Sequence, residues 1–533
     1  MERTSVVKSE TLAIADRSVM AILPWVIISL GIVLRLRQFL FNRSLSFDES
    51  LVALNIIERS FLELAKPLDY KATAPIGFLM IEKLLVYIFG DHEYVLRFLP
   101  FFAGVISLLL FYEVAKRCVG LKGVIIALGL FALSDPLIYY STELKQYSSD
   151  VTIGLFLCLI GISLLRQETL SYRVIVSSAI VGPTLILFSY PAVFTLAGIG
   201  VTLIAAALRD HSWKKLSQLL GVFLFWLLGF STVYLLFLHS LANNDYFVDG
   251  WQDLGGFMPL VPSSLTQIRW FASNFFEIFR YPAGLALSGI GALAFLAGST
   301  AFMKDKRRMF LMLISPIIFT LLASGLHKYP FSGRLILFIV PALLIVIGKG
   351  IEWIVDKTWS TAPIVAVATT ALLFFHPLFY AGHHLLHART VEELRPVIEY
   401  LAQRRQNGDV FYLYYGAEYI FKYYQKKHGF ADGDYILGIK SRKYFNNYVA
   451  DLERLRGNKR VWVVFSHNFS ARGIDEELFF LFNLDRMGTR VDAFKSIDAA
   501  AYLYDLTPRD ELKTPPGTDG LPIDTLRQSH FRE

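Results

Sequence analysis

The chain has 533 residues, of which 54% are hydrophobic and only 18% are charged, and its mean hydropathy is +0.46. These values are too apolar for an ordinary soluble protein, so they exclude that class and indicate an integral membrane protein. The net charge of +7 does not indicate nucleic-acid binding. The basic residues fall mainly in short loops between apolar segments, where membrane insertion explains them.

Eleven apolar segments are predicted to cross the membrane in alternating directions. The basic residues 1–19 precede the first span, and we expect them in the cytoplasm. In chain order the predicted spans are 20–41, 95–115, 124–140, 148–165, 174–188, 191–208, 216–239, 283–303, 310–326, 335–355 and 362–380. Together they form a transmembrane domain over residues 20–380.

The apolar segment 75–90 is expected to lie at the membrane interface rather than to span the bilayer. It is short and carries Glu82 and Lys83 in its middle. The first outer loop is therefore predicted to run from residue 42 to residue 94. With this register, basic residues gather in four cytoplasmic loops, as the positive-inside rule requires. They are Lys116, Arg117 and Lys122; Arg166 and Arg173; Arg209, Lys214 and Lys215; and Lys304, Lys306, Arg307 and Arg308.

After residue 380 the composition becomes that of a soluble protein. Helix-like segments at 391–406 and 474–482 and strand-like segments at 410–415 and 461–465 predict a small α/β domain over residues 381–507. The polar, turn-rich residues 508–533 are expected to form a flexible tail. The predicted fold class is a multi-spanning α-helical membrane protein, with about 11 to 13 transmembrane helices and a small C-terminal extracytoplasmic α/β domain.

Four outer-loop segments hold polar residues that membrane insertion does not require. They are Asp48 and Glu49; Tyr70 and Lys71; Glu143, Lys145, Tyr147 and Asp150; and His327, Lys328 and Arg334. Although they are far apart in sequence, all lie on one face of the membrane in the predicted topology. Carboxylates supply a general base for a hydroxyl group, and cationic side chains hold a phosphate leaving group. A lipid-borne sugar phosphate needs both, at the depth of the lipid headgroups.

Each of these side chains also has a structural interpretation. Ser46 and Glu49 have the spacing of a capping box, in which the two side chains satisfy the backbone at the start of a helix. Asp48 is not needed for that box. The other charged candidates also fit the roles of headgroup attraction, interfacial anchoring or charges on a turn; they are Lys71, Lys328, Arg334, Glu143 and Lys145.

The residues imply no cofactor. His383 and His387 have the i, i+4 spacing of helical metal ligands, but no partnered carboxylate motif accompanies them, so we expect no metal there. Cys118 and Cys158 belong to or flank apolar spans and predict neither a disulfide nor a metal site. Dependence on a divalent metal elsewhere is left open.

At these positions the sequence resembles the lipid-linked-sugar glycosyltransferases of the GT-C type. They include the protein O-mannosyltransferases and the lipid A aminoarabinose transferase, and the resemblance is to glycosyltransferase family 39. Phe47-Asp48-Glu49 is similar to the family's acidic pair in the first outer loop, and Glu143-x-Lys145-x-Tyr147 to its acidic-basic-tyrosine motif. Residues 96–100, which open a span ending at 116–117, are similar to another signature. The resemblance covers residues 20–380.

The resemblance implies a hexosyl- or pentosyltransferase that uses a polyprenyl monophosphate sugar, by inverting direct displacement and without a nucleotide sugar. Asp48 would be the catalytic base, with Glu49 as the second candidate. Separately from the resemblance, the charge and predicted outer position of Lys71, Arg334 and Lys328 make them the candidates that hold the donor phosphate. The additional site candidates are Tyr70, Glu143, Lys145, Tyr147, Asp150 and His327.

The expected partners are the polyprenyl-phosphate sugar, membrane lipid, and an acceptor that is a protein, a lipid or a glycan. The expected location is the bacterial inner (cell) membrane, with the active site and the C-terminal domain facing the periplasm or exterior. The rival class is a transporter or flippase of lipid-linked sugars. Such proteins place polar residues near the midplane and often have repeated halves. Here the spans are nearly free of charge, which favours the enzyme.

Overall fold

The computed structural model describes residues 2–239, 244–471 and 473–508, so the expected flexible tail lies outside the described residues except for its first residue. The chain divides into two compact units. The membrane unit consists of the residues up to Asn42, Arg59–Leu68 and Thr73–Arg389. The α/β unit consists of Arg43–Glu58, Asp69–Ala72 and the chain from Thr390 onward.

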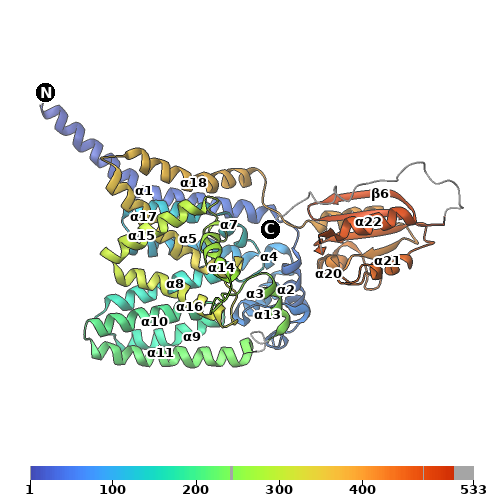
Figure 1. Cartoon of the computed structure of the whole chain (residues 1–533), viewed down its shortest axis with the longest axis horizontal. Helices are drawn as coiled ribbons and strands as arrows, with labels where there is room; N and C mark the ends of the chain where they lie inside the picture. Colours follow the sequence, from blue (N-terminus) through green and yellow to red (C-terminus); the bar gives the residue numbers. More distant parts are fainter. Residues whose placement is uncertain (1, 240–243, 472, 509–533) are drawn as a thin grey trace. The chain divides into compact units, whose positions relative to one another are not determined.

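The membrane unit is a bundle of long helices that run side by side (Figure 1). Its long helices are α1 (Glu2–Phe41), α5 (Phe98–Cys118), α6 (Leu121–Leu133), α8 (Tyr147–Arg166), α9 (Tyr172–Ile186), α10 (Ala192–Arg209), α11 (Trp213–Val233, continued by the π-helical η3, Tyr234–Leu238), α15 (Ser288–Asp305), α16 (Arg307–Gly325), η4 with α17 (Gly333–Ile339 and Val340–Thr358) and α18 (Pro363–Leu386). The predicted spans overlap these helices, except that the span expected at 124–140 is divided at Ser134 between α6 and the short helix α7 (Asp135–Tyr140). Among the described residues, eight helices are long and apolar enough to cross a membrane.

Shorter helices connect the long ones. They are η1 (Glu63–Ala65), α3 (Ile76–Phe89), α4 (Glu93–Leu96), α7 (Asp135–Tyr140), α13 (Asp245–Asp253) and α14 (Leu265–Arg280). Helix α3, the expected interfacial segment, is not among the eight long apolar helices, and it lies with α4 and α13 at one end of the bundle (Figure 1). Its Glu82 is fully buried within the protein, so this charged residue does not face lipid.

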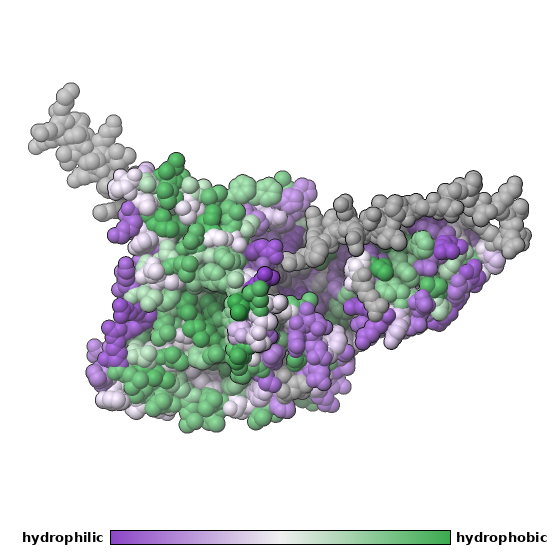
Figure 2. All heavy atoms as spheres, in the orientation of Figure 1, coloured by the Kyte–Doolittle hydropathy of each residue, from purple (hydrophilic) through white to green (hydrophobic). Residues whose placement is uncertain are grey.

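The surface of the bundle is apolar along the helices and hydrophilic at their ends (Figure 2). This pattern fits a bilayer, where side chains in the hydrocarbon must be apolar and charges lie at the interfaces. The multi-spanning α-helical fold is confirmed. Two glycines let α15 and α17 approach closely, because a Cβ atom at Gly298 or Gly350 would lie 1.9 Å from a carbonyl oxygen of the facing helix.

The connecting loops gather in two groups. Loops with the basic clusters contact one another through Lys122 and Asp356 (2.7 Å) and through the Lys306 Nζ donating to the Cys118 carbonyl (3.0 Å). Where α9 ends, the Leu187 carbonyl accepts the N–H of Gly77 at 2.8 Å. This contact joins two of the predicted outer segments of the membrane unit.

The α/β unit contains a five-stranded sheet with the order β2-β1-β3-β7-β6. The strands are β1 (Val410–Leu413), β2 (Tyr435–Leu437), β3 (Val461–Ser466), β6 (Thr489–Ser496) and β7 (Ala499–Asp505), and β4 (Ser470–Ala471) pairs with β5 (Ile474–Asp475). Strand β1 is parallel to β2 and β3, whereas β7 is antiparallel to β3 and β6. The predicted C-terminal α/β domain is confirmed.

Helices of the α/β unit come from two parts of the chain. They are α2 (Phe47–Glu58), η2 (Asp69–Lys71), α19 (Leu394–Arg404), η5 (Tyr415–Ala417), α20 (Glu418–Gln425), η6 (Lys426–His428), α21 (Asn446–Glu453) and α22 (Glu476–Met487). The helix expected at 474–482 begins instead at Glu476, because residues 474–475 pair as strand β5, and it continues to Met487. The acidic segment of the first outer loop thus belongs to the same compact unit as the C-terminal sheet.

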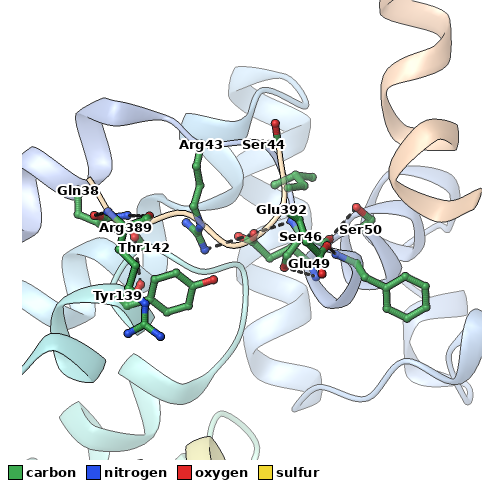
Figure 3. A network of polar contacts seen from close by, with 12 residues as sticks. Gln38, Arg43, Ser44, Ser46, Glu49, Ser50, Tyr139, Thr142, Arg389 and Glu392 are labelled. Atoms are coloured by element: carbon green, nitrogen blue, oxygen red, sulfur yellow. Dashed lines mark hydrogen bonds and ion pairs between the residues drawn. The ribbon is translucent and has the colours of Figure 1, made fainter. Parts of the chain in front are cut away.

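The capping box at the start of α2 has its reciprocal hydrogen bonds. The Ser46 N–H donates to Glu49 Oε2 at 3.0 Å, and the Glu49 N–H donates to Ser46 Oγ at 3.4 Å (Figure 3). Glu49 Oε2 also pairs with the Arg43 guanidinium at 3.3 Å, and both side chains are almost fully buried. Glu49 therefore satisfies backbone donors and a buried cation at once.

We predict that Glu49→Gln destabilises the α/β unit. The amide removes the negative charge that faces the buried Arg43 guanidinium, and breaking such a pair costs about 3–5 kcal/mol. Ser60 and Glu63 form the same type of box, with a Ser60 N–H to Glu63 Oε2 distance of 2.8 Å, but both residues are exposed. Glu63→Gln is therefore the matched control.

The measurement is the unfolding temperature of each purified variant in detergent. A large decrease is expected for Glu49→Gln and a small one for Glu63→Gln. Equal decreases would show that the buried ion pair contributes nothing beyond the capping bonds.

Candidate active site

Asp48 lies in the first turn of α2 and is half-buried. The preceding residue is held firmly, because the Phe47 N–H donates to Glu392 Oε2 at 2.6 Å and its ring stacks on the His467 ring at a centroid distance of 4.3 Å. A carboxylate in the first turn of a helix is stabilised by the helix dipole. Asp48 therefore follows a residue that is anchored to Glu392 and His467 of the α/β unit.

Nearby carboxylates raise the pKa of the His467 imidazole. Burial lowers its pKa, but the hydrogen bond with Glu392 and the charges of Glu392, Asp48 and Asp498 outweigh burial and raise it. His467 and Asp48 are therefore close enough for their charges to interact.

Tyr70 and Lys71 follow α2 in the same unit but differ in their surroundings. The Tyr70 hydroxyl donates to Glu58 Oε2 at 3.0 Å and accepts from Lys422 Nζ at 2.6 Å, so it is part of a structural network. Lys71 is exposed. Burial lowers the pKa of Lys440, and the charges of Arg442 and Lys71 lower it further. Lys71 therefore belongs to a group of cations that includes Lys440 and Arg442.

In the membrane unit, the loop before α8 places Glu143, Lys145 and Tyr147 in buried positions. The Arg334 guanidinium lies over the Tyr147 ring, 5.7 Å from its centroid. Burial raises the pKa of the Tyr281 hydroxyl, and the charges of Glu143 and Arg334 act on the same group in opposite directions. The structure thus brings Glu143, Tyr147 and Arg334 to one place.

Asp150 begins the membrane-spanning part of α8 and is 4% exposed. Its Oδ1 atom has no hydrogen-bond partner within the part of the chain that the structure describes. Burying a polar atom without a partner is costly, so such atoms often have a functional reason. Asp150 remains a candidate site residue because it lies in the first turn of α8, directly after the loop that holds Glu143.

A cavity of about 330 Å³ lies in the membrane unit beside these residues. Aromatic rings make up much of its lining, and Gln146, His327 and Lys328 add polar groups. His327 adopts a left-handed backbone at φ +55°, and its ring packs against Phe257 at 4.8 Å. The lining includes Tyr190, Phe194, Phe230, Tyr234, Trp251 and Tyr329. An apolar cavity of this size with a few polar groups is typical of a small-molecule or lipid site.

Sequence analysis did not single out Lys440, Arg442, Glu392 or His467. Each lies in the C-terminal domain, where no spacing or motif connects it with the first outer loop. The pair of carboxylates at 392–393 lies within the helix predicted at 391–406 and gave no separate signal. Only the tertiary structure shows that Glu392 accepts a hydrogen bond from Phe47.

The sequence was compared with protein-family models and with curated proteins. Residues 73–235 match the family model described as dolichyl-phosphate-mannose-protein mannosyltransferase. No curated protein matches the sequence.

Several solved structures have a similar fold. ArnT from Cupriavidus metallidurans in the apo state is 14% identical with a TM-score of 0.52, and the match covers 92% of this chain and 98% of that one. The structure of the same protein bound to undecaprenyl phosphate is 13% identical with a TM-score of 0.51, and the match covers 90% of this chain and 97% of that one. The oligosaccharyltransferase of Archaeoglobus fulgidus in the apo form is 12% identical with a TM-score of 0.50, and the match covers 83% of this chain and 69% of that one. The resemblance to the lipid-linked-sugar glycosyltransferases is confirmed, and the chain has the GT-C fold.

Proposed function

We propose that this protein is a glycosyltransferase that moves a sugar from a polyprenyl monophosphate to an acceptor hydroxyl at the outer face of the membrane. The single observation that carries the proposal is the cavity of the membrane unit. Its aromatic lining suits an apolar lipid, and His327 and Lys328 supply polar and cationic groups beside it. A lipid that ends in a sugar phosphate needs this combination.

The comparisons support the nature of the donor. The family model that matches residues 73–235 is described by a dolichyl-phosphate mannose substrate, and the similar ArnT structure contains undecaprenyl phosphate. Both are polyprenyl monophosphates. We extend this donor class to the present chain, and leave the sugar and the acceptor class (protein, lipid or glycan) open.

The proposed reaction is a direct displacement. Asp48 takes the proton of the acceptor hydroxyl as its oxygen attacks the anomeric carbon, and the bond between that carbon and the phosphate oxygen breaks. The polyprenyl phosphate leaves with the bonding electrons, and the anomeric configuration is inverted. We assign the phosphate to Lys71, Arg334 and Lys328 because cations stabilise the developing negative charge.

The proposed orientation follows the distribution of basic residues. The loops with Lys122 and Lys306 meet at one end of the bundle, which the positive-inside rule assigns to the cytoplasm. The cavity-lining loop with His327 and Lys328 joins α16 to η4 at the opposite end of α16. We infer that this end faces the exterior or the periplasm of a bacterial inner membrane.

We predict that Asp48→Asn abolishes most turnover while leaving the fold intact. The amide preserves size but cannot accept the proton, and removal of a general base typically costs about 10²- to 10⁴-fold in rate. The measurement is the release of polyprenyl phosphate from a lipid-linked sugar by the purified variant in the presence of acceptor. Asp434→Asn, which changes an exposed carboxylate of the same unit, is the control and should retain activity. Near-normal turnover by Asp48→Asn would exclude it as the base.

A further prediction concerns the donor phosphate. Lys71→Met and Arg334→Met keep apolar stems but remove the charge, and loss of a charge-assisted contact of about 1.5–3 kcal/mol should weaken donor use about 10- to 100-fold. Lys66→Met removes an exposed cation of the same loop and serves as the control. The readout is kcat/KM for the lipid-linked donor. If both variants match the parent, the phosphate is bound elsewhere.

A further inference from the structure

Three side chains of the α/β unit that commonly bind metals lie together: Glu392, His467 and Asp498. Their ligand atoms, one from each side chain, all lie within 4.8 Å of one another. Glu392 is 5% exposed and His467 is half-buried. Two ligand atoms that are each about 2.0–2.2 Å from an ion are at most ~4.4 Å apart. Only small side-chain movements would therefore let all three share one ion.

The sheet explains why these residues meet. Strands β3 and β7 are antiparallel, and the last residue of β3, Ser466, is paired with the first residue of β7, Ala499. His467 directly follows β3 and Asp498 directly precedes β7. The pairing therefore places the two residues side by side, at the end where β3 finishes and β7 begins. The Glu393 N–H donates to the Ile497 carbonyl at 2.8 Å, which brings the segment of Glu392 to the same turn.

Further contacts orient the cluster. Glu392 Oε2 accepts the Phe47 N–H, so its Oε1 atom is left facing His467 Nδ1, at 2.5 Å. The Phe47 ring stacks on the imidazole and limits its rotation. Asp498 Oδ1 accepts the Asn468 N–H at 3.5 Å. Outer contacts that fix the orientation of each ligand are a general property of metal sites.

We propose that Glu392, His467 and Asp498 bind one divalent transition-metal ion of the zinc or manganese class. Imidazole nitrogen suits zinc and similar ions, and carboxylate oxygen suits manganese, so a set of one nitrogen and two oxygens fits this class better than calcium or magnesium. Two carboxylates and one neutral imidazole also carry the charge that a divalent ion neutralises. On binding, the imidazole gives up any extra proton to solvent, and its contact with Glu392 is replaced by bonds to the ion.

The site has consequences for the start of α2. Glu392 holds the Phe47 N–H, and Phe47 stacks on His467, so an ion between these ligands would fasten the C-terminal sheet to the residue that precedes Asp48. A bound ion should therefore stabilise the folded α/β unit. This inference rests on the geometry of the α/β unit and stands whether or not the chain transfers sugars.

The test uses the full chain, purified in detergent, treated with EDTA and freed of the chelator by gel filtration. It is then incubated with Zn²⁺ or Mn²⁺ alone. Bound metal is measured by inductively coupled plasma mass spectrometry, and the unfolding temperature is recorded with and without the ion. We expect about one ion per chain and a metal-dependent rise in unfolding temperature.

The test variants are Asp498→Asn and His467→Asn. Both positions have left-handed backbone, at φ +47° and +52°, which asparagine tolerates. Each variant should lower the metal affinity by at least about tenfold and remove the metal-dependent rise in unfolding temperature. His428→Asn removes another histidine of the same unit outside the cluster and should bind metal like the parent. A parent protein that binds no ion, or a folded Asp498→Asn variant that binds as the parent does, would overturn the proposal.

Discussion

The first backbone N–H groups of a helix have no partner within that helix, and buried carboxylates accept N–H groups at and just before the start of α2. Glu49 accepts from Ser46, Glu392 accepts from Phe47, and Glu393 accepts from both the N–H and the hydroxyl of Ser44. Glu392 and Glu393 lie more than 300 residues further along the chain. The candidate base Asp48 is therefore positioned by the C-terminal sheet domain, although it directly follows the first membrane span in sequence.

The membrane unit obeys a different constraint, the absence of water in the hydrocarbon. Its helices are apolar along their length, and charged residues are confined to the ends or buried, as Glu82 is. The polar groups around Tyr147 and Arg334 lie at the starts of α8 and η4 and not along the helices. Because apolar side chains line the helices and polar groups lie at their ends, the membrane unit can hold a cavity with an apolar lining and a cation, Lys328, beside it. The proposed donor requires this combination.

Much of this arrangement could be predicted from sequence because it depends on local or periodic patterns. The spans follow from apolar segments, and the cap of α2 follows from the spacing of Ser46 and Glu49, whereas the interfacial position of α3 stays a prediction. Strand β7 was missed because its Ala499–Ala501 start has low strand propensity and is stabilised by pairing on both sides. The cluster of Glu392, His467 and Asp498 was missed because antiparallel pairing, not sequence spacing, brings it together. The catalytic and phosphate-binding roles of the candidate residues stay predictions.

The central claim is that the sugar comes from a polyprenyl monophosphate and is transferred, not transported. The most direct measurement supplies the purified protein, reconstituted in vesicles, with acceptor-containing membranes and either a radiolabelled polyprenyl-phosphate sugar or the matching nucleotide sugar. The account predicts label in the acceptor, with inverted anomeric configuration and stoichiometric release of polyprenyl phosphate, from the lipid-linked donor only. Transfer from the nucleotide sugar, or movement of intact lipid-linked sugar between leaflets without transfer, would contradict it.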